Sequence, residues 1–245
     1  MIVRCRIELT PDRVIACRPE WGYHLYAALL ERGPQGYAQK IHQDGPSPVS
    51  QYLCARDGRI LWTVTLLGEE AREALAPLLE AEAVYRLKRE QVELRAALRT
   101  LDEIATPEAL FLRAAAATST HALSFNTPTA FKSRGEYQIL PTPRLILQSL
   151  MKKWNACFPE CPIEDEDGQG MEAMATGLLC RHYRLRDQPY HIKGQTIPGF
   201  VGELTLENRL TDFHRQLADA LLYFADYAGI GIKTTLGMGG TEHRA

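Results

Sequence analysis

The order of elements that this 245-residue chain predicts defines an α+β fold made of two similar halves. Three observations carry the prediction. The first half gives strand, helix, strand, strand, helix and strand, which is the split βαβ, or ferredoxin-like, arrangement. The second half repeats this order without repeating the sequence, and a glycine-rich segment ends it. We therefore predict two tandem ferredoxin-like (RRM-like) domains, residues 1–112 and 113–245, with a cleft between their antiparallel sheets.

The first half opens with a strand, because apolar and polar residues alternate over residues 2–9. Aromatic residues and leucines at helical spacing predict a helix over 21–30. Two strand-like runs, at 49–55 and 60–67, flank an Asp-Gly turn and predict a hairpin. The half continues with a helix over 69–81, in which Pro77 suggests a break or an irregular turn. One or two strands are expected over 84–101, and a short helical turn at the domain junction starts at Thr106.

The second half is expected to begin with a strand and a long helix, at 119–126 and 141–158. A polar loop rich in acidic residues follows over 159–170. Two further strands surround a hairpin, and an amphipathic helix with one apolar stripe comes after them. These three elements are expected at 175–186, 199–206 and 211–228. The glycine-rich segment then leads to, or interrupts, a last strand.

The composition is that of an ordinary globular protein, with 45% apolar and 24% charged residues. No window of the sequence is apolar enough to predict a transmembrane helix, and the first residues lack the apolar core of a signal peptide. The six cysteines are scattered, which favours reduced thiols and a cytoplasmic location without a membrane partner. The net charge of −2 does not by itself indicate a nucleic-acid binder, so any such site has to be local.

The glycine-rich segment places glycines at 229, 231, 237, 239 and 240 around Lys233, Thr234 and Thr235. Glycines let the backbone approach a ligand closely, and exposed N–H groups can then hold phosphate. Mononucleotide and dinucleotide signatures fit poorly, because Ile232 precedes the lysine and the glycine spacing differs. Two interpretations stay open: contact with an extended phosphate backbone, or close packing of the segment itself.

The strongest candidates for catalysis are His42, in a loop after a predicted helix, and its neighbours Lys40, Tyr26 and His24. Histidine transfers protons near neutral pH. Such a set suits cleavage of an RNA phosphodiester, because the 2′-hydroxyl is the nucleophile and no metal or cofactor is needed. No metal-ligand motif is visible in the sequence. The alternative is that His42 is a solvated loop residue and the tyrosines are packing residues.

Several segments together resemble one family. Residues 229–239 resemble the glycine-rich signature of the repeat-associated mysterious proteins. Within that superfamily, residues 124–132, 141–155 and 198–202 are similar to the CRISPR repeat-RNA-processing endoribonucleases. The helix around Tyr23 and the Ile41-His42 pair are similar to the N-terminal helix and catalytic histidine region of those enzymes.

The resemblance implies metal-independent cleavage of precursor CRISPR RNA within each repeat, which leaves 5′-hydroxyl and 2′,3′-cyclic phosphate ends. The family histidine corresponds to His42, and Tyr26, His24 and Lys40 are its candidate assistants. Asp44, close to His42 in sequence, would favour the imidazolium form. The candidate RNA contacts are Gly229, Gly231, Lys233, Thr234, Gly237, Gly239, Lys132, Arg134 and Arg184.

The predicted partner is CRISPR repeat RNA. A homodimer and hand-over of the product to an effector complex are further options that the sequence leaves open. The alternative function is a non-catalytic RNA-binding subunit of an effector complex, because the same fold and glycine segment serve there. A small-nucleotide enzyme is a third option, against which the glycine spacing argues.

Overall fold

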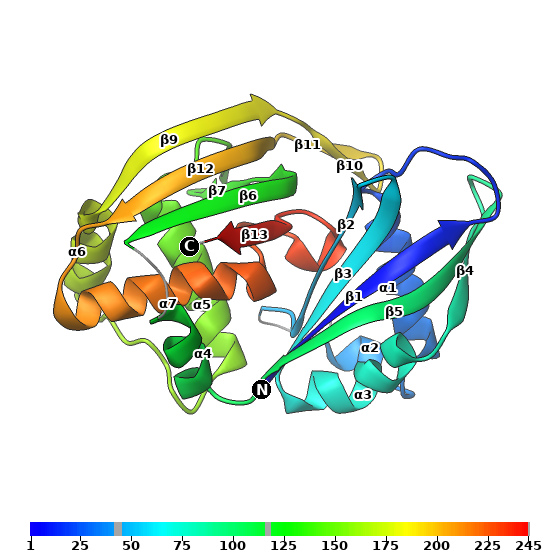
Figure 1. Ribbon diagram of the computed structural model, residues 1–245, viewed down its shortest axis with the longest axis horizontal. Coiled ribbons are helices and arrows are strands. Elements are labelled where there is room, and N and C mark those ends of the chain that lie inside the picture. The colour runs from blue at the N-terminus through cyan, green and yellow to red at the C-terminus, as the bar shows by residue number, and fades with distance from the viewer. Residues whose placement is uncertain (42–45, 116–118, 245) are drawn as a thin grey trace.

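The computed structural model describes residues 1–41, 46–115 and 119–244, and it confirms two antiparallel sheets covered by helices (Figure 1). The N-terminal sheet has the strand order β2-β3-β1-β5-β4. Its strands are β1 (Ile2–Pro11), β2 (Val49–Arg56), β3 (Arg59–Leu67), β4 (Ala83–Leu87) and β5 (Val92–Ile104). Its helices are α1 (Trp21–Arg32), the short α2 (Tyr37–Lys40) and α3 (Glu69–Glu80). The region predicted as one or two strands is the β4–β5 hairpin.

The C-terminal sheet has the strand order β13-β6-β12-β9. It comprises β6 (Thr120–Thr129), β9 (Leu178–Asp187), β12 (Phe200–Asn208) and β13 (Thr241–Arg244), with helices α5 (Pro143–Cys157), α6 (Gln169–Gly177) and α7 (Asp212–Ala228). Without the edge strand β4, the N-terminal sheet has the order β5-β1-β3-β2, and the C-terminal sheet has the order β13-β6-β12-β9. In each half the last strand thus lies beside the first, and the third strand separates the first from the second. The predicted tandem ferredoxin-like fold is therefore confirmed.

Two small hairpins extend from the C-terminal half. One is β7 (Phe131–Ser133) with β8 (Glu136–Gln138), and the other is β10 (Tyr190–Ile192) with β11 (Gln195–Ile197). Helix α4 (Pro107–Ala114) connects the halves and packs on α7. The predicted domain boundary at 112/113 falls within this helix and stays a prediction. No helix of the described ranges is long and apolar enough to cross a bilayer.

Local sequence signals explain where the connecting helices begin. The Thr142 hydroxyl accepts the backbone N–H of Leu145, and Pro143 occupies the first turn of α5. Thr106 and Pro107 repeat the device at α4. A threonine cap satisfies an N–H that has no partner inside the helix, and proline lacks the N–H that would be unpaired there. The same two-residue pattern therefore starts both helices.

Two details of the sequence prediction were wrong. Residues 175–177, expected in a strand, belong to helix α6, which the Asp165 carboxylate stabilises by accepting the N–H groups of Gly170 and Met171. Pro77 does not break α3, which continues to Glu80. Because Pro77 lies in the last turn, the helix loses few bonds to the missing N–H. The β7–β8 hairpin was not anticipated.

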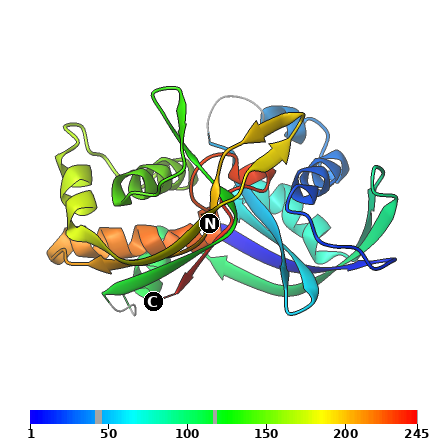
Figure 2. The same cartoon turned by 90° about the horizontal axis from the view of Figure 1, so that it is seen from above.

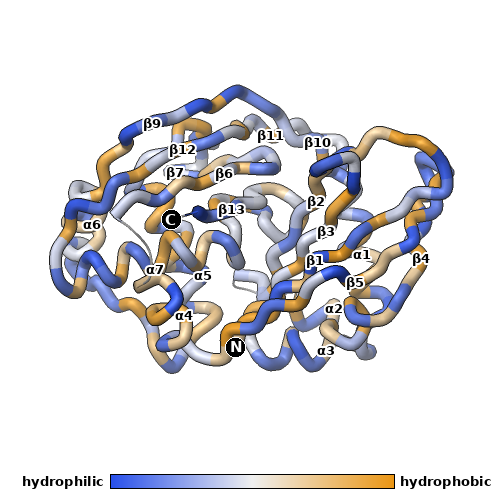
Figure 3. The backbone as a smooth tube through the Cα atoms, viewed as in Figure 1, coloured by the Kyte–Doolittle hydropathy of each residue, from blue (hydrophilic) through white to orange (hydrophobic). Residues whose placement is uncertain are grey.

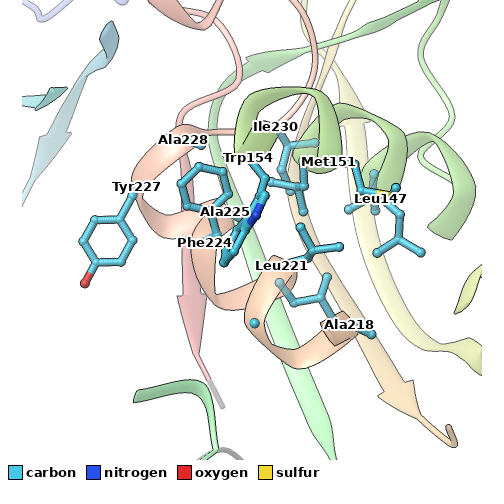
Figure 4. Close-up of a cluster of buried hydrophobic side chains, with 14 of the residues drawn as sticks. Leu147, Met151, Trp154, Ala218, Leu221, Phe224, Ala225, Tyr227, Ala228 and Ile230 are labelled. Atoms are coloured by element: carbon cyan, nitrogen blue, oxygen red, sulfur yellow. The ribbon is translucent and has the colours of Figure 1, made fainter. Parts of the chain in front are cut away.

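The larger hydrophobic core lies between the C-terminal sheet and its helices (Figure 4). Trp154 of α5 packs edge-on against Phe224 of α7, with ring centroids 5.6 Å apart. Ile2, Leu67 and Ile104 of the N-terminal sheet are buried in this same core. The two halves are consequently joined by shared apolar packing. By contrast, the edge strand β9 is hydrophilic and exposed over most of its length (Figure 3), which protects a free edge against pairing with other chains.

A buried charge network also joins the halves. Arg4 of β1 forms ion pairs with Asp226 of α7 and, at 3.1 Å, with Asp102 of β5. The Tyr227 hydroxyl donates to Asp102 at 2.7 Å, and the Arg4 guanidinium lies 4.3 Å from the Tyr227 ring centroid. Burial alone would raise the pKa of Asp102, but hydrogen bonds from Arg113 and Tyr227 and the Arg4 charge hold it below its ordinary value. The network thus fixes β1 and β5 against α7.

Candidate functional site

The glycine segment forms a compact loop between the two halves, drawn in red near the middle of Figure 1. It leaves α7 at Gly229, makes one turn of 3-10 helix, η1 (Thr234–Leu236), and enters β13. The N–H of Ile230 donates to Gly239 at 2.9 Å, which closes the loop at its base. Lys233 at the outer bend is exposed and has a positive φ of 54°. The loop therefore presents its lysine while its base is fixed.

Close packing requires glycine at several positions of this loop. A Cβ on Gly239 would lie 2.1 Å from the Ile230 carbonyl oxygen, and one on Gly231 would lie 2.3 Å from that of Ala130. The corresponding distance for Gly237 is 2.7 Å, to the Tyr190 hydroxyl. Contact with a phosphate backbone and close packing of the segment both require a close approach of the glycine backbone. In the structure this backbone lies close to other parts of the protein. Contact of these glycines with RNA stays a prediction.

Most of the loop amides already have acceptors in the protein. The N–H groups of Gly229 and Gly239 donate to the carbonyl oxygens of Ala225 and Pro128 at 3.0 Å each. The N–H of Gly231 donates to the Ser149 hydroxyl at 2.8 Å. Lys233 is the exposed side chain that the loop offers to a ligand, and no described acceptor takes the backbone N–H groups of Lys233, Thr234 and Thr235.

A central pocket of about 280 Å³ lies beside the loop, between the two halves. Residues of the N-terminal half, of β7, of α5 and of the glycine loop form its walls. They are Pro46, Ser47, Leu67, Phe131, Lys132, Leu145, Gln148, Ser149, Lys152, Lys153, Ala228, Gly231, Ile232, Lys233, Thr234 and Thr235. Four of the seven lysines of the chain are in this set, and its described residues include no carboxylate. The pocket is thus a cationic site in a chain of net charge −2.

The four lysines differ in their surroundings. Lys132, Lys152 and Lys233 are exposed, and none of them makes an ion pair with any described residue. Lys153 instead donates to the carbonyl oxygens of Ala228 at 3.1 Å and Gly229 at 2.9 Å. Burial lowers the pKa of Lys153 to about 7. Three lysines are therefore available to an anionic ligand, and the fourth holds the start of the loop.

The predicted catalytic residue His42 lies outside the described residues, as does Asp44. Pro46 and Ser47, which follow His42 closely in sequence, line the central pocket. Tyr26 is buried in the N-terminal core, where burial raises the pKa of its hydroxyl to about 12 although a hydrogen bond with Ser47 acts in the opposite direction. Tyr26 is thus connected to the pocket wall through Ser47.

The structure does not bring His24, Lys40, Arg134 or Arg184 into the central pocket. His24 is exposed in a separate hollow, beside Tyr23 and the β10–β11 turn. The Lys40 side chain donates to Glu70 at 2.7 and 2.8 Å. Arg134 occupies the β7–β8 turn with a φ of 51°, and Arg184 lies on the exposed edge strand β9. Of the predicted cations that the structure describes, only Lys132 and Lys233 meet in the pocket.

Sequence reasoning gave no role to the residues that α5 contributes to the pocket. They are Leu145, Gln148, Ser149, Lys152 and Lys153. The first four follow a spacing of three, one and three residues, which places them on one helix face. The polar residues on one face of this predicted helix were a signal that the sequence contained. The sequence did not indicate which part of the protein that face would lie beside.

The fold and the pocket define a class: a tandem ferredoxin-like protein with a glycine loop at a cationic junction. Comparisons narrow this class. The sequence model of the CRISPR-associated endoribonuclease Cas6 family matches residues 123–241. The Mycobacterium tuberculosis CRISPR-associated endoribonuclease Cas6 is 34% identical over 228 residues, covering 89% of this chain and 70% of that protein. The Streptococcus thermophilus enzyme of the same name is 30% identical over 221 residues, 87% of each chain.

Solved structures agree with the sequence relatives. A Cas6 product complex superimposes with a TM-score of 0.77 and 26% identity over 100% of both chains. Thermus thermophilus Cas6 gives a TM-score of 0.69 and 27% identity over 100% of this chain and 98% of that one. The chain belongs to the Cas6 family of CRISPR-associated endoribonucleases. The predicted family and enzyme class are thereby confirmed.

Proposed function

We propose that this protein cleaves precursor CRISPR RNA within its repeats and that the scissile phosphate is held at the central pocket. The 2′-hydroxyl attacks the adjacent phosphorus, the bond from phosphorus to the 5′-oxygen breaks, and the leaving oxygen takes up a proton. The products are a 2′,3′-cyclic phosphate and a 5′-hydroxyl. The observation that carries the proposal is the set of four lysines without a carboxylate among the described pocket residues.

Elementary electrostatics supports this location. RNA brings one negative charge per nucleotide, and its binding to lysines releases counterions. Cations placed where charge develops also stabilise the phosphorane-like transition state. Lys132, Lys152 and Lys233 come from three separate elements, and no described carboxylate neutralises them. Arg134 and Arg184, outside the pocket, would then contact more distant phosphates.

His42 is the residue that we propose for proton transfer, either from the 2′-hydroxyl or to the 5′-oxygen. Its support is its sequence context and the position of Pro46 and Ser47 in the pocket wall. Tyr26 keeps its proposed role as an assistant, acting on Ser47, whereas the roles of His24 and Lys40, which line other hollows, rest on the sequence alone. No metal ion or cofactor takes part in the proposed steps. We place the reaction in the cytoplasm, because all six cysteines are free thiols.

The test uses labelled repeat RNA with excess protein in the presence of a chelator. We expect cleavage to continue in the chelator, and a repeat with a 2′-deoxy nucleotide at the scissile position to bind without being cut. His42→Ala should abolish cleavage, whereas the control His214→Ala, an exposed histidine of α7 away from the pocket, should cleave normally. Full activity of His42→Ala, or complete loss of activity in the chelator, would refute the mechanism.

The same assay distinguishes cleavage from the alternative function, which is RNA binding without cleavage. Tight, salt-sensitive binding of the repeat without cleavage would identify a non-catalytic subunit. Light scattering with and without RNA tests the homodimer, and product retention on a size-exclusion column tests hand-over to an effector complex.

A further inference from the structure

We propose that the central pocket seats one nucleobase next to the scissile phosphate and that Gln148 reads the edge of this base. The inference rests on the proposed function and adds to it a specificity-determining site. It begins from the two kinds of surface in the pocket. Leu67, Leu145, Phe131 and Ile232 contribute apolar walls, whereas exposed lysines surround them.

This combination fits a nucleotide better than other ligands. A nucleobase is a flat ring with apolar faces, and the phosphates beside it are anionic. A volume of about 280 Å³ lies at the small end of ligand sites and suits a single base, not a stacked pair or a duplex. A protein side chain from a partner would not require three lysines without ion pairs to described residues. The pocket chemistry therefore points to one unstacked base of an RNA strand.

Gln148 is the only carboxamide among the described residues of the pocket wall, and most of the other uncharged polar groups there already have partners in the protein. The Ser149 hydroxyl already accepts the N–H of Gly231, and the Thr235 hydroxyl donates to Val49 at 3.0 Å. Lys153 is occupied by the carbonyl oxygens of α7 and the loop. The Gln148 carboxamide makes no hydrogen bond to any residue that the structure describes, although it lines the pocket. A carboxamide offers a donor and an acceptor side by side, which matches the edge of a base.

The arrangement of the elements supports access by a single strand. The β7–β8 hairpin projects beside the junction between the halves, and the glycine loop lies at the junction itself (Figure 2). Lys132 of this hairpin and Lys233 of this loop line the same pocket as Gln148 of α5. A strand that passes between hairpin and loop places its phosphates by the lysines and can turn one base inward.

The test measures single-turnover cleavage of repeats that carry each of the four bases at each nucleotide near the cut. We expect the unaltered protein to prefer one base at one of these positions by about tenfold, the discrimination that a pair of hydrogen bonds provides. Gln148→Leu should lose this preference and retain its rate on the least favoured base. The control Gln169→Leu, at the exposed start of α6, should keep the preference.

A second variant tests the pocket without removing a hydrogen-bonding group. Leu145→Trp fills the apolar wall and should weaken binding of all repeats with loss of the same base preference. The inference is overturned if Gln148→Leu keeps every base preference of the unaltered protein, or if it slows all four bases equally. If the unaltered protein cuts no repeat, the proposed function fails. Dissociation constants for the same panel, carrying 2′-deoxy scissile nucleotides, then decide whether Gln148 reads a base.

Discussion

The side-chain nitrogen of Lys153 lies 2.9 Å from the carbonyl oxygen of Gly229, to which it donates a hydrogen bond. It also donates to Ala228, the last residue of α7. The final carbonyls of a helix have no partner within the helix, so a donor placed there satisfies them. Lys153 thus ends α7 and fixes the start of the glycine loop from the neighbouring helix.

Replacement of Lys153 by methionine keeps the aliphatic stem and removes the donor. We expect Lys153→Met to lower the free energy of unfolding by about 1–3 kcal/mol, because two buried carbonyls lose a partner. Urea unfolding at pH 8 measures the change. Lys152→Met, on the same helix but exposed, is the control and should change stability little.

Lys153 also predicts a pH dependence. Burial lowers its pKa to about 7, below the ordinary value of 10.5, so the unfolded chain binds more protons here than the folded one between these values. The contribution of Lys153 to the free energy of unfolding therefore rises as the pH increases from 7 towards 10.5. The difference in unfolding free energy between the unaltered protein and Lys153→Met should grow over this range. A difference that stays constant from pH 6.5 to 9.5 would contradict the prediction.

A second group predicts the behaviour in acid. His243 lies 2.9 Å from His121, which is buried and contacts Asp219 at 2.8 Å. Burial, together with His121, lowers the pKa of His243 from 6.5 to about 4. Its contribution is fully present above pH 6.5 and is lost as the pH falls towards 4. We expect a loss of at most about 3 kcal/mol, and thermal unfolding of His243→Asn should show a smaller acid dependence.

The glycine loop predicts a contrast between two alanine substitutions. Gly231 and Gly194 both have positive φ, 86° and 74°, but only Gly231 would place a Cβ against a backbone atom. Gly231→Ala should cost about 2–4 kcal/mol, because strain and a steric clash add. Gly194→Ala, with open space around it, should cost only about 1 kcal/mol. Equal costs in denaturant unfolding would mean that the loop relaxes without difficulty.

The lysines of the pocket predict a change in salt dependence. Each lysine that contacts a phosphate of single-stranded RNA contributes about 0.7 to the slope of log affinity against log salt concentration. Lys132→Gln, Lys152→Gln and Lys233→Gln should each lower the slope by about this amount. Lys88→Gln, in the exposed β4–β5 turn, is the control and should leave the slope unchanged. Fluorescence anisotropy over a series of salt concentrations provides the slopes.

The order of the elements could be predicted because the periodicity of apolar residues depends only on the local chain. The alternation in β1 and the apolar stripe of α7 are examples, and both elements were found where expected. Helix α6 was missed because its stability comes partly from Asp165, whose carboxylate caps it across a turn. The hairpin β7–β8 was missed because strands of three residues carry too little pattern.

The site could be predicted only where one segment contains its own signal. The glycine loop with Lys233 was such a segment. Lys152 and Gln148 line the central pocket because α5 lies beside a loop about eighty residues later in the chain, and that neighbourhood exists only in the folded protein. The role of His42 was predicted from its sequence context and stays a prediction.

The ion pair of Arg4 with Asp226 has a consequence for how a substrate is accommodated. Separation of the halves would break the Arg4–Asp226 ion pair and the Tyr227–Asp102 hydrogen bond, whereas Arg4 and Asp102, both in the N-terminal sheet, would stay paired. The loss of a partner by the partly buried Asp226 carboxylate costs free energy. The shared core around Ile2 and Leu67 would be exposed to water as well. We therefore expect little hinge motion between the halves, so that a substrate would have to adapt to the protein. If the proposed function holds, a repeat that must bend or unpair to reach the lysines would supply that deformation from its own flexibility.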